Sequence, residues 1–408
     1  MCRLGCYGGF NMTDYLIVGN GIAGTTAAEK IRKQDKEGRI TIVTDEDVPF
    51  YYRIRLNEYL SGEMAEEELV AKREDWYQRN DVTLKLNTKV SGGVPGENAL
   101  ITSDNEKISY DKLLLATGSH SFIPPIKGSE KKGVFALRSV RDAREISSWA
   151  GGVEDVVLIG GGLLGLEAGN ALRRLGKKVT VVEFFPRLLP RQLDVDGARM
   201  LQKTMEGMGF SFRLGAKTEA IQGVDGVDGV QLEGGETLPA KMVVISAGVR
   251  PNMELAQSLG LDYDKGIQVN ERLVTSNPYV YAAGDVAEFK GMPYGIWPAA
   301  MEQGKIAGSN MAGGDMVYQG TTMANTLKVV GVDLASAGNI DATNVLESRT
   351  VMDETVYRKV VLEKDRIVGC IMLGNTKGFN RVTKAMAEKI NISGVKDEIL
   401  SDNFEFKG

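Results

Sequence analysis

The sequence predicts an α/β protein that contains two similar βαβ domains and a small α+β domain at the C-terminus. Two observations predict the paired domains. A strand, a glycine turn, a helix and a second strand begin at residue 14 with the turn GNGIAG, and the same pattern begins again at residue 155 with GGGLLG. The third observation is a change of pattern at about Val317. From there, short alternating stretches precede a helix-like segment at 377–390, which indicates a separate α+β domain.

Composition excludes several classes of function. The net charge of −5 argues against nucleic acid as a partner, and no apolar run reaches the ~18 residues that span a bilayer. Three cysteines, none of them in a C-x-x-C pair, exclude an iron–sulfur centre, and a single histidine excludes a multi-histidine metal site. We therefore expect no metal, no membrane span and a cytoplasmic protein, and we leave a homodimer open.

The first glycine turn has the spacing of a dinucleotide-binding turn. Gly19 permits the tight turn, Gly21 lets the backbone approach a pyrophosphate, and Gly24 lets the helix pack on the strand. An acidic residue at the end of the second strand would bind a ribose. Alignment of the two units places Thr44 at that point, so Asp45 is our choice, and a solvated acidic turn is the alternative.

The second turn repeats this spacing with Gly160, Gly162 and Gly165. Glu183 stands at the end of the following strand. A carboxylate there accepts a hydrogen bond from a ribose 2′-OH and repels a 2′-phosphate, so it favours NADH over NADPH. Arg187 follows nearby, as does Arg191, and an arginine could serve a 2′-phosphate instead.

Several motifs coincide in one order between Tyr15 and Ala312: GNGIAG, LLLATGS, GGGLLGLE, ISAGVRPN and YAAGDVAE. With them the sequence resembles the FAD-dependent pyridine-nucleotide oxidoreductases of glutathione-reductase type. The stretches YYRIRL and PRQLD are most similar to NADH:rubredoxin reductases and to the flavin portion of nitrite reductase large subunits. The tail, with LKVVGVDLASAGN and CIMLGNT, resembles the latter as well.

The resemblance implies two Rossmann-like domains, with the NADH domain inserted in the FAD domain. The FAD domain would comprise residues 12–119 and 251–316, the NADH domain 120–250, and a C-terminal interface or docking domain 317–408. Besides the three glycines of the first turn, the FAD site would include Asp45, Arg53, Ala116, Thr117, Gly118, Gly284, Asp285 and Trp297. The NADH site would include Gly160, Gly162, Leu164, Gly165, Glu183 and Gly248.

Three of these assignments carry a mechanistic role. The helix that starts near Trp297 would direct its N-terminus at the flavin and stabilise the anionic reduced form. Arg53 would lie beside the flavin as a cation, and Glu167 would lie near the nicotinamide, so these two are the predicted catalytic residues. The alternatives are a core or interface tryptophan, a surface arginine and an ordinary helix glutamate.

Departures from the family pattern narrow the chemistry. Single-cysteine relatives carry the thiol shortly after the second strand, but Pro49–Arg55 contains no sulfur. The base histidine of the family is also missing, and we expect His120 to be a surface residue. Electrons would therefore leave the flavin directly for an external acceptor. Because the chain lacks siroheme and iron–sulfur cysteines, we do not expect it to reduce nitrite alone.

We predict an NADH-dependent flavoprotein that reduces a small electron-transfer protein of rubredoxin or ferredoxin type. A flavin subunit of a larger complex with a separate redox subunit, an NADH oxidase or quinone reductase, and a non-catalytic nucleotide sensor are the alternatives. If 377–390 is helical, Lys377, Arg381 and Lys384 share one face and could dock an acidic carrier. A solvated helix face is the alternative for these three residues.

Overall fold

The computed structural model describes residues 12–94, 96–321, 324–401 and 404. These residues form two compact units. The first comprises 12–52, 66–120 and 249–321, and the second comprises 53–65, 121–248 and the described residues from 324 onward. The short segment 53–65 therefore groups with the second unit, whereas the resemblance placed it in the FAD domain.

The first unit is built on a parallel sheet of five strands in the order β19-β7-β1-β2-β3. The central strands are almost wholly buried, as expected for a parallel sheet that is covered on both faces. The strands are β1 Asp14–Val18, β2 Arg39–Val43, β3 Val82–Lys85, β7 Lys112–Leu115 and β19 Val280–Ala282.

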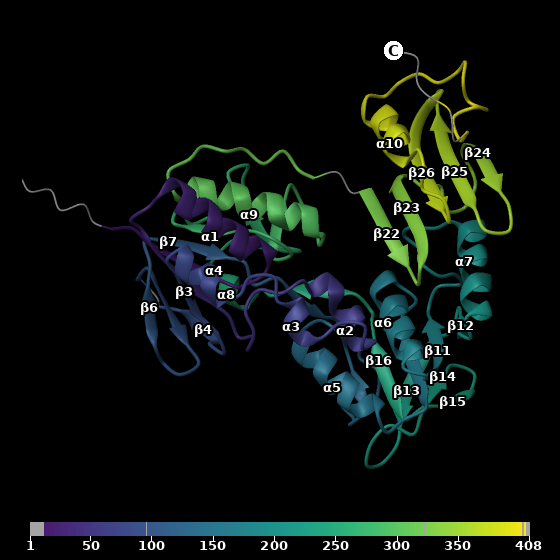
Figure 1. Cartoon of the computed structure of the whole chain (residues 1–408), viewed down its shortest axis with the longest axis horizontal. Helices are drawn as coiled ribbons and strands as arrows, with labels where there is room; N and C mark the ends of the chain where they lie inside the picture. The colour runs from purple at the N-terminus through teal and green to yellow at the C-terminus, as the bar shows by residue number, and fades with distance from the viewer. Residues whose placement is uncertain (1–11, 95, 322–323, 402–403, 405–408) are drawn as a thin grey trace, which may run out of the picture. The chain divides into compact units, whose positions relative to one another are not determined.

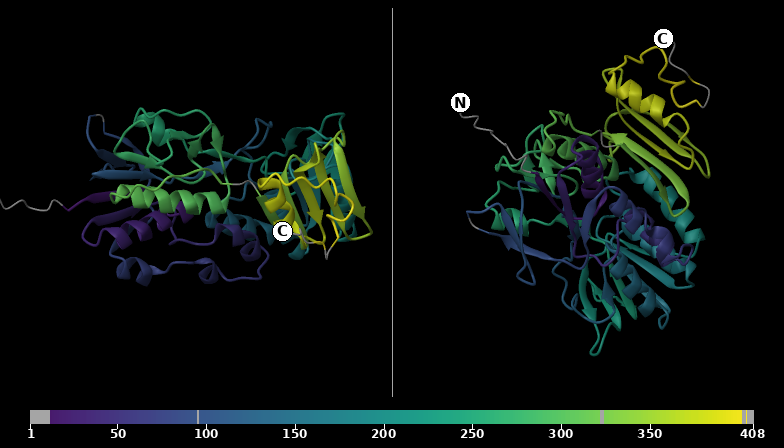
Figure 2. Two further views of the ribbon diagram at one scale, coloured as in Figure 1. Left: turned by 90° about the horizontal axis from the view of Figure 1, so that it is seen from above. Right: turned by 60° about the vertical axis from the view of Figure 1, so that its left-hand side comes forward.

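Helices α1 (Ile22–Gln34) and α9 (Trp297–Met311) lie side by side although they are far apart in the sequence (Figures 1 and 2). Glycines allow this close approach: a Cβ on Gly304 would meet the carbonyl oxygen of Ala23 at 2.3 Å, and one on Gly308 would meet that of Ala27 at 2.5 Å. Because 304 faces 23 and 308 faces 27, the two helices run in the same direction. Their N-termini therefore lie at the same end.

Smaller elements complete the first unit. Strands β4, β5 and β6 form an antiparallel sheet. Strands β18, β20 and β21 form a mixed sheet, in which β18 and β20 are parallel and β20 and β21 are antiparallel. The bounds are β4 Val90–Gly93, β5 Ala99–Thr102, β6 Lys107–Ser109, β18 Ile267–Val269, β20 Ala287–Phe289, β21 Met292–Pro293, α3 Glu66–Leu69, α4 Glu74–Arg79 and α8 Glu254–Ser258. The short strands β8 (Ser119–Ser121) and β17 (Val249–Pro251) stand where the chain passes from one unit to the other.

The second unit repeats the parallel sheet, here in the order β12-β11-β10-β16-β9. Its strands are β9 Val134–Phe135, β10 Asp155–Ile159, β11 Lys178–Glu183, β12 Ser211–Leu214 and β16 Met242–Ile245. Its other elements are η1 Arg53–Arg55, α2 Leu56–Leu60, α5 Val140–Ala150, α6 Leu163–Arg174, α7 Val195–Gly207, β13 Thr218–Gln222, β14 Gly229–Leu232 and β15 Thr237–Pro239.

The C-terminal part of the second unit is an antiparallel sheet in the order β22-β23-β26-β25-β24, with α10 packed on it (Figure 2). An apolar face of α10 packs on this sheet, because Phe379 and Val382 are buried and Met386 packs against the same cluster, as does Ile390 just beyond the helix. The bounds are β22 Ala324–Val329, β23 Val332–Gly338, β24 Glu347–Met352, β25 Tyr357–Glu363, β26 Arg366–Leu373 and α10 Phe379–Ala387.

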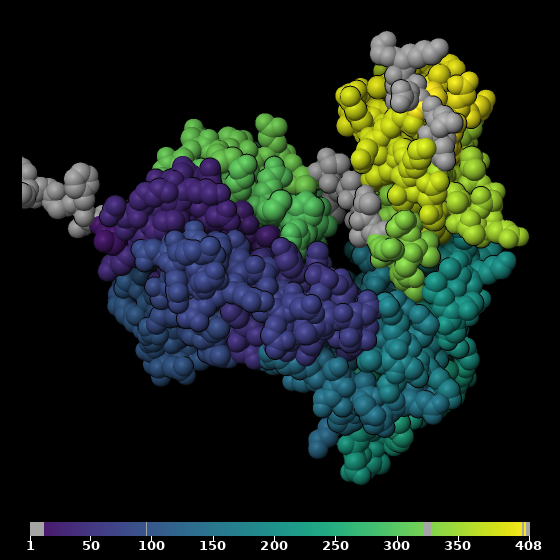
Figure 3. All heavy atoms as spheres, viewed as in Figure 1, coloured from purple at the N-terminus to yellow at the C-terminus, as the bar shows by residue number. Residues whose placement is uncertain are grey.

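The C-terminal sheet shares one hydrophobic core with the parallel-sheet domain of the same unit. Val330, Tyr357 and Ile371 belong to the same buried cluster as Leu166 and Leu193. Figure 3 shows the yellow-green start of this sheet against the teal residues of the parallel-sheet domain.

The two parallel sheets with their helices, together with the C-terminal sheet, confirm the predicted α/β fold class. None of the described helices is long and apolar enough to cross a lipid bilayer.

Candidate dinucleotide sites

The three glycines of the first turn have different surroundings. Gly19 has a φ of +110°, and a Cβ there would lie 2.1 Å from the carbonyl oxygen of Ala116. A Cβ on Gly24 would lie 2.1 Å from the carbonyl oxygen of Gly19, so Gly24 lets the helix approach the turn. Gly21 differs, because no heavy atom lies within 4 Å of its Cβ position. It begins α1 and faces open space where a phosphate could meet free N–H groups.

The second turn has the same geometry. Gly160, with a φ of +115°, would place a Cβ 2.2 Å from the carbonyl oxygen of Ser246, and Gly165 would place one 2.5 Å from that of Gly160. The middle glycine, Gly162, begins α6 and again faces open space. Leu164 follows in the first turn of the helix and is half exposed, at 53%. Both turns can therefore take a diphosphate over a helix N-terminus.

Three separate segments meet at the start of α1 in the first unit. A Cβ on Gly284 would lie 3.2 Å from the Cβ of Ala23 and 3.8 Å from that of Ala300. The N–H of Gly284 donates to Oε1 of Gln303, at 2.8 Å. Asp285 is half-buried, and its Oδ2 accepts from the Ser119 hydroxyl at 2.8 Å. The predicted Gly284 and Asp285 therefore lie at the junction of both helix N-termini.

One buried amide group near this junction has a donor to spare. Among the described residues, Nδ2 of Asn20 is buried without a hydrogen-bond partner. The other end of this amide is engaged, since its Oδ1 accepts from the Tyr77 hydroxyl at 3.0 Å. The Gln303 amide differs, because its Oε1 accepts from Gly284 and its donor end lies toward the Tyr318 hydroxyl. A buried unpaired donor is costly unless a ligand supplies an acceptor, so the Asn20 amide fits a phosphate or ribityl oxygen of FAD.

The loop that follows β7 is fixed by an asparagine from another part of the chain. Nδ2 of Asn252 donates to the Thr117 carbonyl at 2.7 Å, and the N–H of Asn252 donates to the Gly118 carbonyl at 3.1 Å. Gly118 has a φ of +67°, and no heavy atom lies within 4 Å of its Cβ position. Ala116 precedes this loop, and its carbonyl group packs against Gly19 of the first glycine turn. His120 is exposed, as expected, and contacts Oδ1 of Asn252.

Helix α9 begins at Trp297, as predicted, with Pro298 in its first turn and no side-chain cap. Its first N–H groups are thus free for a ligand. The Trp297 ring is half-buried, and its centroid lies 6.0 Å from those of Phe50 and Tyr52. Trp297 therefore belongs to an aromatic cluster of the first unit, and the cluster stands at the N-terminus of the helix that the family resemblance directs at the flavin.

The strand ends differ between the two units. Gly19 donates to the Val43 carbonyl, as Gly160 donates to that of Val182, so the position of Glu183 corresponds to Thr44. Thr44 is buried, and the exposed Asp45 follows it one residue later.

Glu183 itself is only 7% exposed. Its Oε2 accepts from the N–H of Gly161 at 2.5 Å, and its Oε1 accepts from that of Phe185 at 2.8 Å. Gly248, which comes after β16, has a φ of +99° and faces open space. Carboxylate oxygens have about four lone-pair sites in all, so Glu183 keeps acceptor capacity for a ribose.

Both predicted catalytic residues make contacts within the second unit. Nη1 of Arg53 donates to the Arg138 carbonyl at 2.5 Å. Oε1 of Glu167 accepts from the N–H of Val330 at 2.6 Å, in the turn between β22 and β23. Burial raises the pKa of Glu167 above its ordinary value of 4.5, and the Val330 bond opposes this shift. The first glycine turn belongs to the other unit.

In the part of the chain that the structure describes, no thiol has the character of a redox relay. Cys370 is the one cysteine in the described part of the chain, and it is fully buried in the C-terminal sheet. Burial raises the pKa of its thiol to about 12, so the reactive thiolate is suppressed. Across the described ranges, no group of acidic, histidine or cysteine side chains could hold a metal ion.

The predicted basic face near the C-terminus is wrong in its composition. Helix α10 begins at Phe379, so Lys377 precedes the helix instead of lying on it. Arg381 is half-buried and donates to the carbonyls of Ser401 and Phe404. Lys384 lies 3.9 Å from Glu388, which dilutes its charge. A helix is present, but it begins after Lys377, so the three cations do not share one helix face.

Sequence reasoning also missed Asn20, Asn252 and Gln303. Asn20 lies inside the motif GNGIAG and Asn252 inside ISAGVRPN, so both could have been singled out. Gln303 had no such signal, because only the packing of α9 on α1 brings it to Gly284.

Comparison with known proteins agrees with this geometry. Residues 13–304 match the family model of the pyridine nucleotide-disulphide oxidoreductases, and residues 324–390 match that of the rubredoxin NAD+ reductase C-terminal domain. The crystal structure of NADH:rubredoxin oxidoreductase from Clostridium acetobutylicum superposes with a TM-score of 0.83 at 27% identity. It covers 95% of this chain and 98% of that chain.

Two curated relatives differ in length. The chain is 37% identical to a nitrite reductase [NAD(P)H] from Bacillus subtilis, over 93% of this chain and 48% of the relative. It is 30% identical to an NADH oxidase from Methanocaldococcus jannaschii, over 90% of this chain and 89% of the relative. The chain thus spans about half the length of the nitrite reductase that it matches. The matched ranges and the two dinucleotide turns establish that this chain belongs to the pyridine nucleotide-disulphide oxidoreductase family, whose members use FAD and NADH.

Proposed function

We propose that the chain takes hydride from NADH with FAD and passes electrons, without a cysteine relay, to a small electron-transfer protein such as rubredoxin. One observation carries the proposal: two equivalent glycine turns, one in each unit, both leave their middle glycine facing open space. Bound FAD would supply hydride acceptance and one-electron release. The protein would supply binding, orientation and exclusion of water.

The first unit would hold FAD. Its Gly21 turn would take the diphosphate, and the spare donor of Asn20 would find an acceptor on the ligand. Asp285, held by Ser119, would accept from ribityl or ribose hydroxyls, and Asp45 would reach the adenosine ribose. The domain boundaries 12–119 with 251–316, 120–250 and 317–408 belong to this proposal.

The second unit would hold NADH. The Gly162 turn would take its diphosphate, and the carboxylate of Glu183 would accept from the ribose 2′-OH. Glu167 is proposed to lie near the nicotinamide and Arg53 near the flavin. Placement of both groups beside the reacting ring would tune the reaction through charge.

A rubredoxin-type acceptor is favoured by the match of residues 324–390 and by the full-length likeness to the Clostridium enzyme. A flavin portion of a larger redox enzyme is the second candidate, because the nitrite reductase relative is about twice as long. An NADH oxidase is the third, because the Methanocaldococcus relative matches over nearly its whole length.

A two-stage stopped-flow experiment separates these candidates. The protein is first reduced with NADH without oxygen and is then mixed with rubredoxin, ferredoxin, a quinone or oxygenated buffer. We expect rubredoxin or ferredoxin to reoxidise it much faster than oxygen does. Cys370→Ala should react at the same rates, since the thiol is buried away from solvent. Fast reoxidation by oxygen and none by either carrier would contradict the proposed acceptor.

A further inference from the structure

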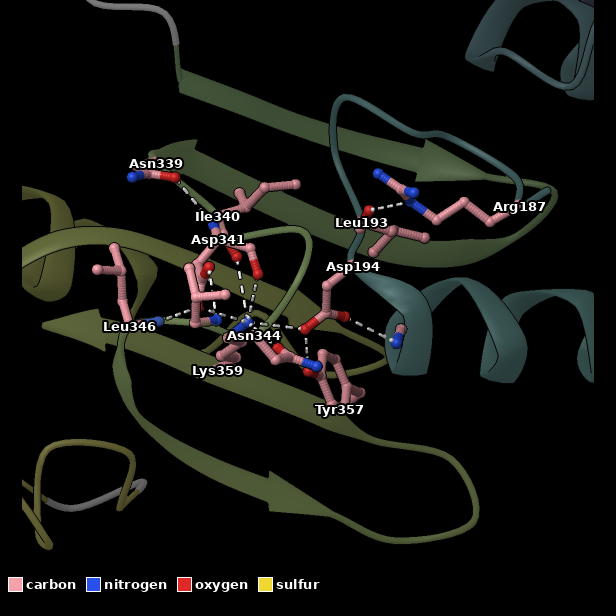
Figure 4. A network of polar contacts seen from close by, with 12 residues as sticks. Arg187, Leu193, Asp194, Asn339, Ile340, Asp341, Asn344, Leu346, Tyr357 and Lys359 are labelled. Carbon is pink, nitrogen blue, oxygen red and sulfur yellow. Dashed lines mark hydrogen bonds and ion pairs between the residues drawn. The ribbon is translucent and has the colours of Figure 1, made fainter. Parts of the chain in front are cut away.

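A buried ion pair joins the C-terminal sheet to the start of α7 in the second unit. Lys359 on β25 and Asp194 before α7 have side chains that are 1% and 0% exposed, and Nζ lies 3.0 Å from Oδ2 (Figure 4). Removal of two charges from water costs free energy, and this cost can exceed the attraction between the charges. A pair of this kind therefore calls for a role beyond general stability.

The ammonium group of Lys359 is surrounded by hydrogen-bond acceptors. Besides Asp194, its ammonium donates to the carbonyls of Ile340 and Asp341 at 3.2 and 3.0 Å, and to Oδ1 of Asn344 at 2.5 Å. The C-terminal domain thus fixes the position of the charge that faces Asp194.

The carboxylate is fixed just as firmly. The Tyr357 hydroxyl donates to Oδ2 of Asp194 at 2.6 Å. The other oxygen, Oδ1, accepts from the N–H of Gly197 at 3.0 Å and caps α7. Tyr357 and Lys359 therefore clamp the residue that ends the loop 184–194, and this loop follows Glu183 directly.

The loop folds back on itself and on the second glycine turn. Nε and Nη2 of Arg187 donate to the carbonyls of Leu193 and Pro190, at 3.3 and 3.1 Å. Leu189 adopts a φ of +47°, which a bulky residue rarely does, and its N–H donates to the Gly161 carbonyl at 3.1 Å. Such a conformation persists only where its surroundings determine it.

Gly161 carries the connection to Glu183. Its carbonyl accepts from Leu189 in the loop, and its N–H donates to Oε2 of Glu183. A continuous set of contacts thus runs from Lys359 through Asp194 and the loop to Glu183.

We infer that Lys359 and Tyr357 are positioning residues through which the C-terminal domain sets the affinity and selectivity for NADH. Their clamp on Asp194 holds the loop so that the Glu183 carboxylate keeps its place and the Arg187 guanidinium stays bound to loop carbonyls. An arginine held in this way is not offered to a 2′-phosphate. The inference rests on the proposed function, in which the second glycine turn holds NADH.

The test compares Lys359→Met and Tyr357→Phe with Lys396→Met in the FAD-loaded protein. Lys396 is a matched control, because it pairs with Asp365 and Glu347 inside the same domain and touches neither Asp194 nor the loop. Calorimetry measures the Kd for NAD+ and for NADP+, and thermal unfolding is recorded in parallel. For the two clamp variants we expect the Kd for NAD+ to rise about three- to thirtyfold and the preference over NADP+ to shrink.

FAD content should stay unchanged in all variants, and Lys396→Met should bind both nucleotides like the wild type. Clamp variants that lose thermal stability but keep the wild-type affinity and preference would overturn the inference. If Lys359→Met does not fold, Tyr357→Phe decides the matter, because it removes one hydroxyl and leaves the ion pair. Gly162→Val separates this inference from the proposed function: normal NAD+ binding by Gly162→Val would refute the proposed NADH site itself.

Discussion

Replacement of Gly21 by valine is expected to abolish FAD binding while the apoprotein stays folded. No heavy atom lies within 4 Å of the Cβ position, and a φ of −79° with a ψ of −171° is ordinary extended backbone for valine. The branched side chain would instead fill the space over the N-terminus of α1. That is where we propose the diphosphate of FAD.

The size of the effect follows from linkage. A ligand present at a hundred times its Kd stabilises a protein by about 2.7 kcal/mol. In a unit of this size, 1 kcal/mol corresponds to a Tm shift of about 2–4 °C. With excess FAD, the Tm of Gly21→Val should therefore fall below that of the wild type by about 5–11 °C. Without FAD, the two proteins should unfold at nearly the same temperature.

Gly24→Ala should differ from Gly21→Val by destabilising the apoprotein itself. Its Cβ would lie 2.1 Å from the carbonyl oxygen of Gly19, so the turn must shift even without a ligand. Overpacking of this kind costs about 1–3 kcal/mol and lowers the Tm of the apoprotein too. Gly207→Val is the matched control, because Gly207 at the end of α7 also has no heavy atom within 4 Å of its Cβ position.

The assay is the flavin absorbance per protein after purification, together with calorimetric unfolding with and without FAD. Stoichiometric FAD in Gly21→Val would refute the assignment of the first turn. So would identical behaviour of Gly21→Val and Gly24→Ala, since the argument depends on one glycine that serves a ligand and one that serves packing.

Three further predictions concern charged side chains. Glu183→Ala should erode the preference for NADH over NADPH roughly ten- to hundredfold, because a charged hydrogen bond contributes ~1.5–3 kcal/mol, and steady-state kcat/KM with both nucleotides measures it; a wild type that uses NADPH equally well would contradict this role. Arg53→Met should lower the flavin potential while FAD stays bound, as a nearby cation favours the anionic reduced form, and an unchanged potential in a dye titration would instead indicate a structural arginine. Burial raises the pKa of Glu167 above 4.5, so its ionisation destabilises the folded state as pH rises through and above that value. The Tm of the wild type minus the Tm of Glu167→Gln should thus be lower at pH 8 than at pH 5. If this difference is the same at both pH values, the reasoning is contradicted.

The fold was predictable because its main signals are local. Each dinucleotide turn is marked by three glycines between a strand and a helix. The structure gives a steric reason for the first and third glycine of each turn, and it leaves open space at the middle one. The start of α10 was not predictable in the same way. Gly378, with a φ of +89°, is the N-cap of that helix and leaves Lys377 outside it, although the polar spacing continues past the glycine.

Parts of the site were hidden because they depend on distant contacts. Lys359 and Asp194 are 165 residues apart in the sequence, and nothing near either residue indicates the other. Gln303 accepts from Gly284, and the neighbouring Gly304 lets α9 approach α1. Such residues become visible when the packing of helices and sheets is known.

The central claim is a flavin site without a thiol relay. An anaerobic titration of the purified holoprotein with NADH, followed by the flavin absorbance, tests it most directly. We predict that bleaching is complete at about one NADH per FAD, because the flavin takes two electrons and the described residues offer no second redox group to take more. A requirement for a second equivalent of NADH per FAD would reveal a further redox group and would contradict the account.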